Sequence, residues 1–389
     1  MANTLKFGAG KWATKEGSVL AYNDLNNNFK PLPFTFTRAS SATRVNESGL
    51  IESVGSGIPR VDFLNNADGH LLLEPSRTNA YPYSNFYGTG GLDAFLTGTS
   101  TSTVTNNYAI SPDGTQNAIR FEATVGSTSS DRAGLRDLLS VSAVDSTISF
   151  YGKSNTGSNQ VIGIQFIGGT QTTVTLTNEW QRFEYTGLSN TSNYCGIEIR
   201  GTITDLSVDV LLYGFQFEAG SYATSYIPTS GSSVTRVVDD IELAFPSTSS
   251  FSSNSGFTSV VEFGVGGRSG SSSSPFLQIN DADGYMSYGS SGGSWRCRLQ
   301  IGATAYLNTA TNTSRDSVAK LGISCDSNGW SQCANGEVYA SGANDASSLN
   351  VLSTITFLTN ETYGQIKIRS LGIYNTRLSD SELEFLTSI

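Results

Sequence analysis

The chain has 389 residues, a formal net charge of −10 at pH 7 and a sequence pI near 4.7. A phosphate backbone is bound by clustered Lys and Arg, so this charge balance argues against nucleic acid as a partner. The N-terminus lacks the apolar core of a signal peptide, and no apolar run approaches the roughly 18 residues that cross a bilayer, so we expect cytoplasmic synthesis and no membrane insertion.

Only 14% of the residues are charged, whereas the chain contains 41 Gly, 20 Phe and 17 Tyr. Such a composition favours short strands joined by tight turns over amphipathic helices, so we predict an all-β protein. The length predicts two or three domains. We expect a small β-rich region of short hairpins over residues 1–79, an antiparallel β-sandwich of the jelly-roll type over 80–236 and a second sandwich over 237–389, ending in one short helix.

Residues 1–36 place three large apolar side chains, Phe7, Trp12 and Tyr22, in a mostly polar background. The segment has too little apolar periodicity to build a core alone. We therefore predict that it packs against another molecule and serves in attachment or assembly. The alternative is an N-terminal arm that packs on its own chain.

Four sequence blocks follow between residues 37 and 79. They read T-R-A-S-S-A-T-R-V (37–45), G-L-I-E (49–52), P-R-V-D-F (59–63) and L-L-L-E-P-S-R-T-N (71–79). In this order the blocks resemble a segment that recurs in tail-fibre and other virion-surface proteins of bacteriophages. Five of their charged residues stand out: Arg38, Arg44, Arg60, Glu74 and Arg77. We expect these groups to form structural ion pairs, because the Arg fork holds carboxylates and loop carbonyls; ligand contact is the alternative.

Strand-like runs at short spacing occupy residues 80–236. The longest, Val208–Phe217, is apolar on both faces, which is typical of a strand inside a sandwich. Trp180 begins an alternating run and is either a core residue or a ring on which a sugar stacks. The blocks S-P-D-G (111–114), S-F-Y-G-K (149–153), E-W-Q-R-F (179–183) and Q-F-E-A-G-S-Y-A-T-S-Y-I-P-T (216–229) resemble carbohydrate-binding-module-like domains of phage structural proteins.

Short strands continue through the last third of the chain. Near its end, Ser379 precedes Glu382 by three residues, a capping box that predicts a short helix. The final strand with this helix, and the Asn335–Gly336 turn, resemble the concanavalin-A-like or laminin-G-like lectin sandwich. That resemblance implies a fold whose members commonly bind glycans or proteins.

Glycan contact requires exposed rings, because the C–H face of a sugar stacks on an aromatic face while its hydroxyls need polar neighbours. In the last third of the chain four aromatic residues stand beside Gly- and Ser-rich loops. We predict these as the glycan-binding candidates: Tyr285, Tyr288, Trp295 and Trp330. Packing in a core or an interface is the alternative for each.

Calcium is the only metal that the sequence suggests. Asp281 and Asp283 offer oxygen ligands at alternate positions, but the closing Glu of an EF-hand is missing, and an Asp-Gly turn explains the pattern as well. No other cofactor is predicted. Cys325 and Cys333 flank an Asn328–Gly329 turn, so they are candidates to face each other across a hairpin, as thiols or as a disulfide.

No catalytic constellation can be proposed. The chain has one histidine and no G-x-S-x-G motif, and its 33 acidic residues single out no pair for glycoside hydrolysis. Together with this, the resemblances described above imply a non-enzymatic fibre protein on the surface of a phage virion that binds a host glycan or receptor during adsorption, which is the function we predict. A capsid head fibre or decoration protein with a structural role is the alternative, and a capsule depolymerase is a third. The fibre resemblance implies a homotrimer whose N-terminal region contacts other virion proteins.

Overall fold

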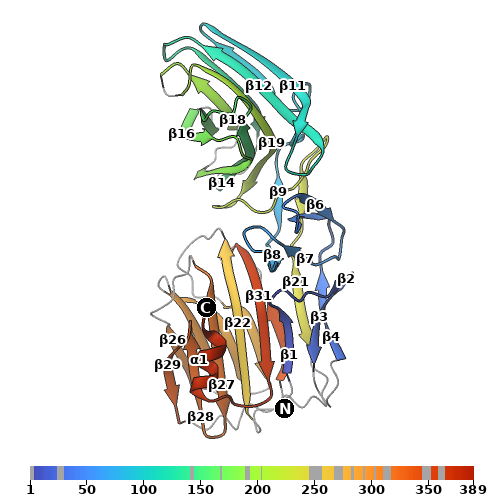
Figure 1. Cartoon of the computed structure of the whole chain (residues 1–389), viewed down its shortest axis with the longest axis vertical. Coiled ribbons are helices and arrows are strands. Elements are labelled where there is room, and N and C mark those ends of the chain that lie inside the picture. The colour runs from blue at the N-terminus through green and yellow to red at the C-terminus, as the bar shows by residue number, and fades with distance from the viewer. Residues whose placement is uncertain are drawn as a thin grey trace. The chain divides into compact units, whose positions relative to one another are not determined.

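The structure is a computed structural model (Figure 1) and describes residues 4–23, 30–140, 144–166, 169–188, 193–202, 204–244, 256–266, 275–281, 284–291, 294–301, 304–309, 317–343, 352–357 and 364–389. Antiparallel sheets make up nearly all of the regular structure, and within these ranges α1 (Asp380–Thr387) is the one helix. The predicted all-β fold with a short C-terminal helix is confirmed. No helix in the same ranges is long and apolar enough to cross a membrane.

The chain forms two compact units, each built from segments that are separate in the sequence. Unit 1 comprises Met1–Ser41, Val54–Pro75 and Val238–Ile389, and unit 2 comprises Ala42–Ser53 and Ser76–Val237. This division differs from the three consecutive ranges expected from the sequence. The reason is that the strands Thr4–Gly8, Lys30–Thr37 and His70–Leu73 pair with strands that follow residue 238.

One antiparallel ladder runs through unit 1. In the order of hydrogen-bonded neighbours it contains β29 (Glu337–Gly342), β28 (Gly329–Ala334), β27 (Ala319–Asp326), β22 (Phe257–Gly266), β31 (Gln365–Tyr374), β1 (Thr4–Gly8), β3 (Ser18–Asn23), β4 (Lys30–Thr37), β21 (Asp240–Ala244), β30 (Leu352–Phe357), β23 (Pro275–Asp281), β24 (Gly284–Ser291), β25 (Ser294–Ile301) and β26 (Thr304–Thr309). The ladder is extended by β2 (Thr14–Lys15) beside β3, and by β8 (His70–Leu73) and β7 (Arg60–Asp62) beside β31.

The N-terminal strands β1, β3 and β4 lie inside this ladder, between β31 and β21. Phe7 of β1 pairs with Leu371, and Phe36 of β4 pairs with Ile241. Each of the three strands therefore has a partner on both sides. The alternative in which the N-terminal segment packs on its own chain describes this structure, and its contact with another molecule stays a prediction.

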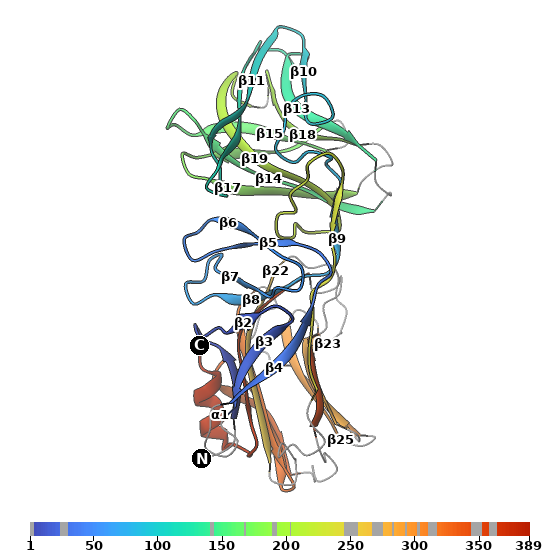
Figure 2. The ribbon, with the colours of Figure 1, turned by 90° about the vertical axis from the view of Figure 1, so that its right-hand side faces the viewer.

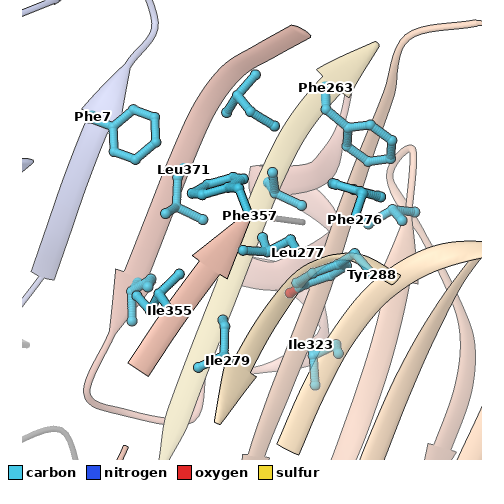
Figure 3. Close-up of a cluster of buried hydrophobic side chains, with 14 of the residues drawn as sticks. Phe7, Phe263, Phe276, Leu277, Ile279, Tyr288, Ile323, Ile355, Phe357 and Leu371 are labelled. Carbon is cyan, nitrogen blue, oxygen red and sulfur yellow. The ribbon is translucent and has the colours of Figure 1, made fainter. Parts of the chain in front are cut away.

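Aromatic side chains from both halves of the ladder meet in the core of unit 1 (Figure 3). The rings of Phe7 and Phe34 meet edge to face with centroids 5.3 Å apart, and Phe263 lies 4.2 Å from Phe276 and 4.7 Å from Trp295. Edge-to-face and tilted pairs of this kind add to the free energy gained by burial. The N-terminal strands thus contribute core residues as well as hydrogen bonds.

A buried ion cluster joins the sequence blocks of residues 37–79 to the start of β21. Arg38 lies 2.9 Å from Asp239, Arg60 lies 2.7 Å from Glu74 and also pairs with Asp239, and all four side chains are fully buried. Burial lowers the pKa of Arg60, but Asp239 and Glu74 outweigh it and the net shift is upward. Removing one partner would leave an uncompensated charge in the interior, at a cost of about 3–5 kcal/mol.

The other two arginines of these blocks pair inside unit 2. Arg44 lies 2.5 Å from Glu52, and Arg77 lies 3.6 Å from the buried Glu218. The structure therefore supports the interpretation that the arginines of the four blocks hold the fold together.

Unit 2 is a sandwich of two five-stranded antiparallel sheets (Figure 2). The first has the order β10 (Asp93–Thr97), β13 (Arg132–Leu139), β18 (Asn193–Arg200), β15 (Gln160–Phe166) and β16 (Gly169–Leu176). The second has the order β11 (Ser100–Ile110), β12 (Gln116–Val125), β19 (Ser207–Ala219), β14 (Asp145–Ser154) and β17 (Gln181–Leu188). Two small ladders join β9 (Arg77–Asn79) to β20 (Val234–Arg236), and β5 (Ala42–Val45) to β6 (Ile51–Val54).

The strand that the sequence marked as apolar on both faces is the central strand β19. It pairs with β12 on one side and β14 on the other, and Phe215 stacks on Phe150 with ring centroids 5.4 Å apart. Its neighbours on both edges and its burial confirm the prediction of a strand inside a sandwich.

The capping box at the C-terminus is also confirmed. The Ser379 hydroxyl accepts a hydrogen bond from the Glu382 backbone N–H, and the Glu382 carboxylate accepts one from the Ser379 N–H at 2.8 Å. Helix α1 packs on the outer side of β22, β27 and β28 through Leu383. Gly322 leaves room for it, because a Cβ at that position would lie 2.7 Å from Leu383 Cδ1.

The two cysteines that flank the Asn328–Gly329 turn do not face each other. In the ladder of β27 and β28, Cys325 pairs with Trp330, whereas Cys333 pairs with Gly322. Cys325 belongs to the main core and Cys333 to the cluster under α1, so their side chains point to opposite faces of the sheet. Both are buried thiols. The hairpin register excludes the facing arrangement that the sequence suggested.

Candidate ligand-binding face

The glycan-binding candidates from the sequence belong to the core of unit 1. Trp295 and Tyr288 are fully buried and Trp330 is 5% exposed. The Tyr288 hydroxyl donates to the Ser259 carbonyl at 2.9 Å. The side chain of Tyr285 lies outside the described residues. The three described rings therefore present no face to a ligand, because the alternation along their strands turns them inward.

Two of the three predicted virion-docking residues, Phe7 and Trp12, also pack in unit 1. Phe7 is buried in the core, and the half-buried Trp12 packs against it while its Nε1 donates to the Asp68 carbonyl at 2.8 Å. Tyr22 lies in β3 opposite Lys6, and its side chain is outside the described residues. Unit 1 itself thus uses the apolar groups that were expected to reach another molecule.

The calcium candidates cannot be judged from the structure. Asp281 ends β23 with its side chain outside the described residues, and Asp283 also lies outside them. Among the residues that are described, no group of three or more His, Cys, Asp or Glu is arranged to hold a metal ion. The single histidine, His70, is buried, and burial together with Lys367 and Arg369 lowers its pKa to about 3.

Trp180 was expected to be either a core residue or an exposed ring for sugar stacking, and in the structure it is half-buried. Its half-buried ring packs against Ile51, Tyr213 and Tyr226, and its Nε1 donates to the Ile110 carbonyl at 3.3 Å. It therefore closes a small apolar cluster in unit 2 that is separate from the main core.

The outer face of the first sheet of unit 2 carries several charged and aromatic side chains that contact one another. Alternation along β13 and β18 turns Leu135 and Ile197 into the core and their neighbours outward. The register of the sheet then sets two cross-strand rows on the outer face. One row is Phe95, Gly134, Glu198 and Gly163, and the next is Asp93, Arg136, Gly196 and Gln165.

Arg136 is held between two aromatic rings on this face. Its guanidinium carbon lies 4.1 Å from the ring centroid of Phe95 on β10 and 4.0 Å from that of Tyr194 on β18. Cation–π contacts of this kind fix the plane of the guanidinium. Among the described residues Arg136 has no hydrogen-bond or ion-pair partner, so the rings position a set of N–H donors that the chain does not use.

Gly134 makes this arrangement possible. A Cβ at Gly134 would lie 2.5 Å from Cε1 of the Phe95 ring and 2.2 Å from the Ile197 carbonyl oxygen. Only a residue without a side chain lets the Phe95 ring lie down on the sheet beside Arg136. We call Phe95, Arg136 and Tyr194 the arginine cradle. Gly134 provides the space that the Phe95 ring occupies in it.

A buried carboxylate pairs with the other two arginines of the face. Glu198 is fully buried, and it accepts hydrogen bonds from Arg132 Nε at 2.9 Å and from Arg200 Nη2 at 3.1 Å. Arg132 and Arg200 are thus committed to Glu198. Burial, which is the largest effect, and the nearby Arg132 lower the pKa of Arg136. As an arginine it keeps its charge at neutral pH.

Two further polar groups beside this cluster lack partners. Gln165 is fully buried, and neither its amide oxygen nor its amide nitrogen has a hydrogen-bond partner; the same holds for the buried Oγ1 of Thr170. An unsatisfied buried polar group costs about 1–3 kcal/mol. In the register, only Gly196 separates Gln165 from Arg136. Unused donors and acceptors therefore concentrate on one half of the sheet.

The second sheet of unit 2 carries an arginine–tyrosine pair that serves as a comparison. Arg120 lies 4.7 Å from the ring centroid of Tyr108. Its charge, however, is taken up by Asp209 at 2.7 Å and by Glu122 at 2.8 Å. The Arg120–Tyr108 pair thus includes carboxylate partners for the arginine, whereas the Arg136–Tyr194 pair has none among the described residues.

The sequence reasoning missed the cluster around Arg136. The pattern R-A-G-L-R over residues 132–136 alternates outward arginines with inward apolar residues, which is a signal for a charged sheet face. The rings that complete the site come from β10 and β18, and their proximity follows from the register, which the sequence does not show.

The comparisons with known proteins add no assignment. The sequence matches no protein-family model and no curated protein. Among solved structures, the fold is similar to the binding domain of botulinum neurotoxin DC in complex with rat synaptotagmin II (12% identity, 38% of this chain, 39% of that chain, TM-score 0.32). It is also similar to the binding domain of Paraclostridial Mosquitocidal Protein 1 (16% identity, 38% of this chain, 43% of that chain, TM-score 0.31). A third is the CBM40 of the Ruminococcus gnavus IT-sialidase bound to α2,6-sialyllactose (14% identity, 35% of this chain, 85% of that chain, TM-score 0.28).

The match thus spans less than half of the first two chains, and at these TM-scores the likenesses carry no functional argument.

Proposed function

We propose that the chain is a non-enzymatic binding protein that recognises a glycan through the outer face of β10, β13, β18, β15 and β16. The observation that carries the proposal is the cradle of Phe95, Arg136 and Tyr194, in which a guanidinium without a partner is positioned between two rings. Sugars are recognised by this combination, because their C–H faces stack on rings and their hydroxyls accept hydrogen bonds from fixed donors.

The setting of this activity is the surface of a tailed-phage virion, where the protein binds its host during adsorption. The sequence blocks of residues 37–79 support this setting through their resemblance to virion-surface proteins. Binding by two rings and a few fixed polar groups requires no reactive centre, and the proposed site contains no nucleophile and base pair among its named residues. A low-resolution map that locates the protein on the particle tests the setting separately from the binding.

The binding itself is tested with the full chain on an array of neutral and acidic oligosaccharides. The Phe95→Ala/Tyr194→Ala double variant removes both rings, and we expect it to weaken glycan binding by about tenfold or more. Tyr108→Ala is the matched control, since Tyr108 is 41% exposed and Tyr194 is 40% exposed, and both lie against an arginine. We expect the control to bind like wild type.

Circular dichroism checks that all variants are folded. Wild-type protein that binds no glycan on the array, or a double variant that binds as well as wild type, would contradict the proposed function.

A further inference from the structure

The charges of the proposed glycan face do not balance within the chain. Glu198 pairs with both Arg132 and Arg200 and is fully buried between them. Asp93 stands directly opposite Arg136 in the register of β10 and β13, yet the two form no ion pair. Arg136 is therefore the arginine of this face that forms no ion pair with a carboxylate of the described residues, in a chain whose net charge is −10.

The geometry of Arg136 limits what can neutralise it. The rings of Phe95 and Tyr194 lie about 4 Å from the central carbon of the guanidinium, and its N–H groups form no hydrogen bond or ion pair within the described residues. A planar guanidinium edge matches the two oxygens of a carboxylate in a bidentate pair. Phosphate sites more often gather several cations, and the neighbouring arginines here are already committed to Glu198.

Two uncharged groups near Arg136 are closed to a ligand. The Gln165 amide and the Thr170 Oγ1 have no hydrogen-bond partner, but both are buried under other parts of the chain. A ligand on this face therefore contacts the two rings and the Arg136 guanidinium, and not these buried groups.

We propose, resting on the glycan-binding function above, that the ligand is an acidic glycan and that a sugar carboxylate binds the N–H edge of Arg136. The rings of Phe95 and Tyr194 contact the sugar or its neighbour.

The test compares each acidic polymer with its own carboxyl-reduced form. Oligosaccharides of polygalacturonate, hyaluronan and alginate are measured by calorimetry against the full chain, before and after their carboxylates are reduced to primary alcohols. We expect at least one native form to bind tenfold or more tightly than its reduced form. The preference should weaken at high salt, because the guanidinium–carboxylate attraction is screened.

The variant arm uses Arg136→Gln and, as a matched control, Arg120→Gln. We expect Arg136→Gln to bind the native and reduced forms equally weakly, and Arg136→Lys to recover only part of the preference because it lacks the fork. Arg120→Gln removes the same charge from the other sheet, where Asp209 and Glu122 neutralise it, and should keep the wild-type preference.

The outcomes separate the two proposals. Equal binding of native and reduced polymers by wild type, or binding of neutral glycans only, overturns the carboxylate assignment and leaves the glycan-binding function standing. Selectivity for a phosphorylated glycan over these polymers also overturns it. Binding of no glycan at all contradicts both. The ligand arm uses wild-type protein alone, so a variant that fails to fold does not remove the test.

Discussion

The pH dependence of unit 1 should be controlled by its one histidine. His70 is 2% exposed, and its Nε2 lies 3.4 Å from Asp62 without hydrogen-bond geometry. Burial, followed by the charges of Lys367 and Arg369, lowers its pKa from 6.5 to about 3. In the unfolded chain the His70 imidazole therefore binds a proton as the pH falls below about 6.5. In the folded chain the same imidazole stays neutral until about pH 3.

This difference between the two pKa values sets the direction in which the free energy of unfolding changes with pH. Stability is lost as the pH falls through the window between the two pKa values, because protonation favours the unfolded state. Between pH 7 and pH 5 the linkage relation gives a loss of about 2 kcal/mol from this group alone. Carboxylates with lowered pKa, such as Asp209 and Asp326, lose their contribution only at lower pH.

The assay is urea unfolding at pH 7 and pH 5, followed by tryptophan fluorescence. Trp12, Trp295 and Trp330 belong to unit 1 and only Trp180 to unit 2, so the signal mainly reports unit 1. In His70→Gln the loss between the two pH values should shrink by about 2 kcal/mol. If wild type and variant lose the same free energy of unfolding, the assignment of the pH dependence to His70 is refuted.

Three further predictions concern the core and the division into units. Trp295→Ala should lower the free energy of unfolding by about 3–5 kcal/mol, because it leaves a cavity beside Phe263, and glycan binding by the folded variant should be unchanged. A fragment of residues 238–389 should show no cooperative urea transition, since it exposes the edges of β31 and β21; a sharp transition would show that β1, β3 and β4 are dispensable. Burial raises the pKa of Cys325 to about 12 and that of Cys333 to about 11, so neither should react with a thiol reagent at pH 8 until unit 1 unfolds, and reactivity in the folded chain would argue against their burial.

The parts of the fold that sequence reasoning predicted are those set by local patterns. Strand β19 was recognisable because both of its faces are apolar, and α1 because Ser379 and Glu382 form a capping box. The inward position of Trp295 also had a local signal, since Trp295, Cys297 and Leu299 alternate with polar residues along β25. Trp295 was predicted to be exposed because it stands beside a Gly- and Ser-rich loop, although this alternation along β25 indicated a buried ring.

The parts that were missed depend on pairing between distant segments. The N-terminal segment looks too polar to form a core because its partners, β21 and β31, lie more than 200 residues further along the chain. The candidate site was missed for the same reason: Phe95, Arg136 and Tyr194 come from three strands that are neighbours in the sheet but are separated in the sequence by other strands. Composition cannot report which of several arginines already has a carboxylate partner.

The interleaved ladder of unit 1 also sets an order of events during synthesis. Strands β1, β3 and β4 leave the ribosome before unit 2 is made, but β21 and β31, which pair with them, are translated after it. Most of unit 2 is one uninterrupted segment that can close on itself in the meantime. Until translation ends, the nascent N-terminal strands carry Phe7, Phe34 and Phe36 on unpaired edges, which is the state in which strands pair with the wrong chain. Yield in a recombinant host should therefore depend on elongation rate and chaperone supply more than the stability of the finished protein would indicate.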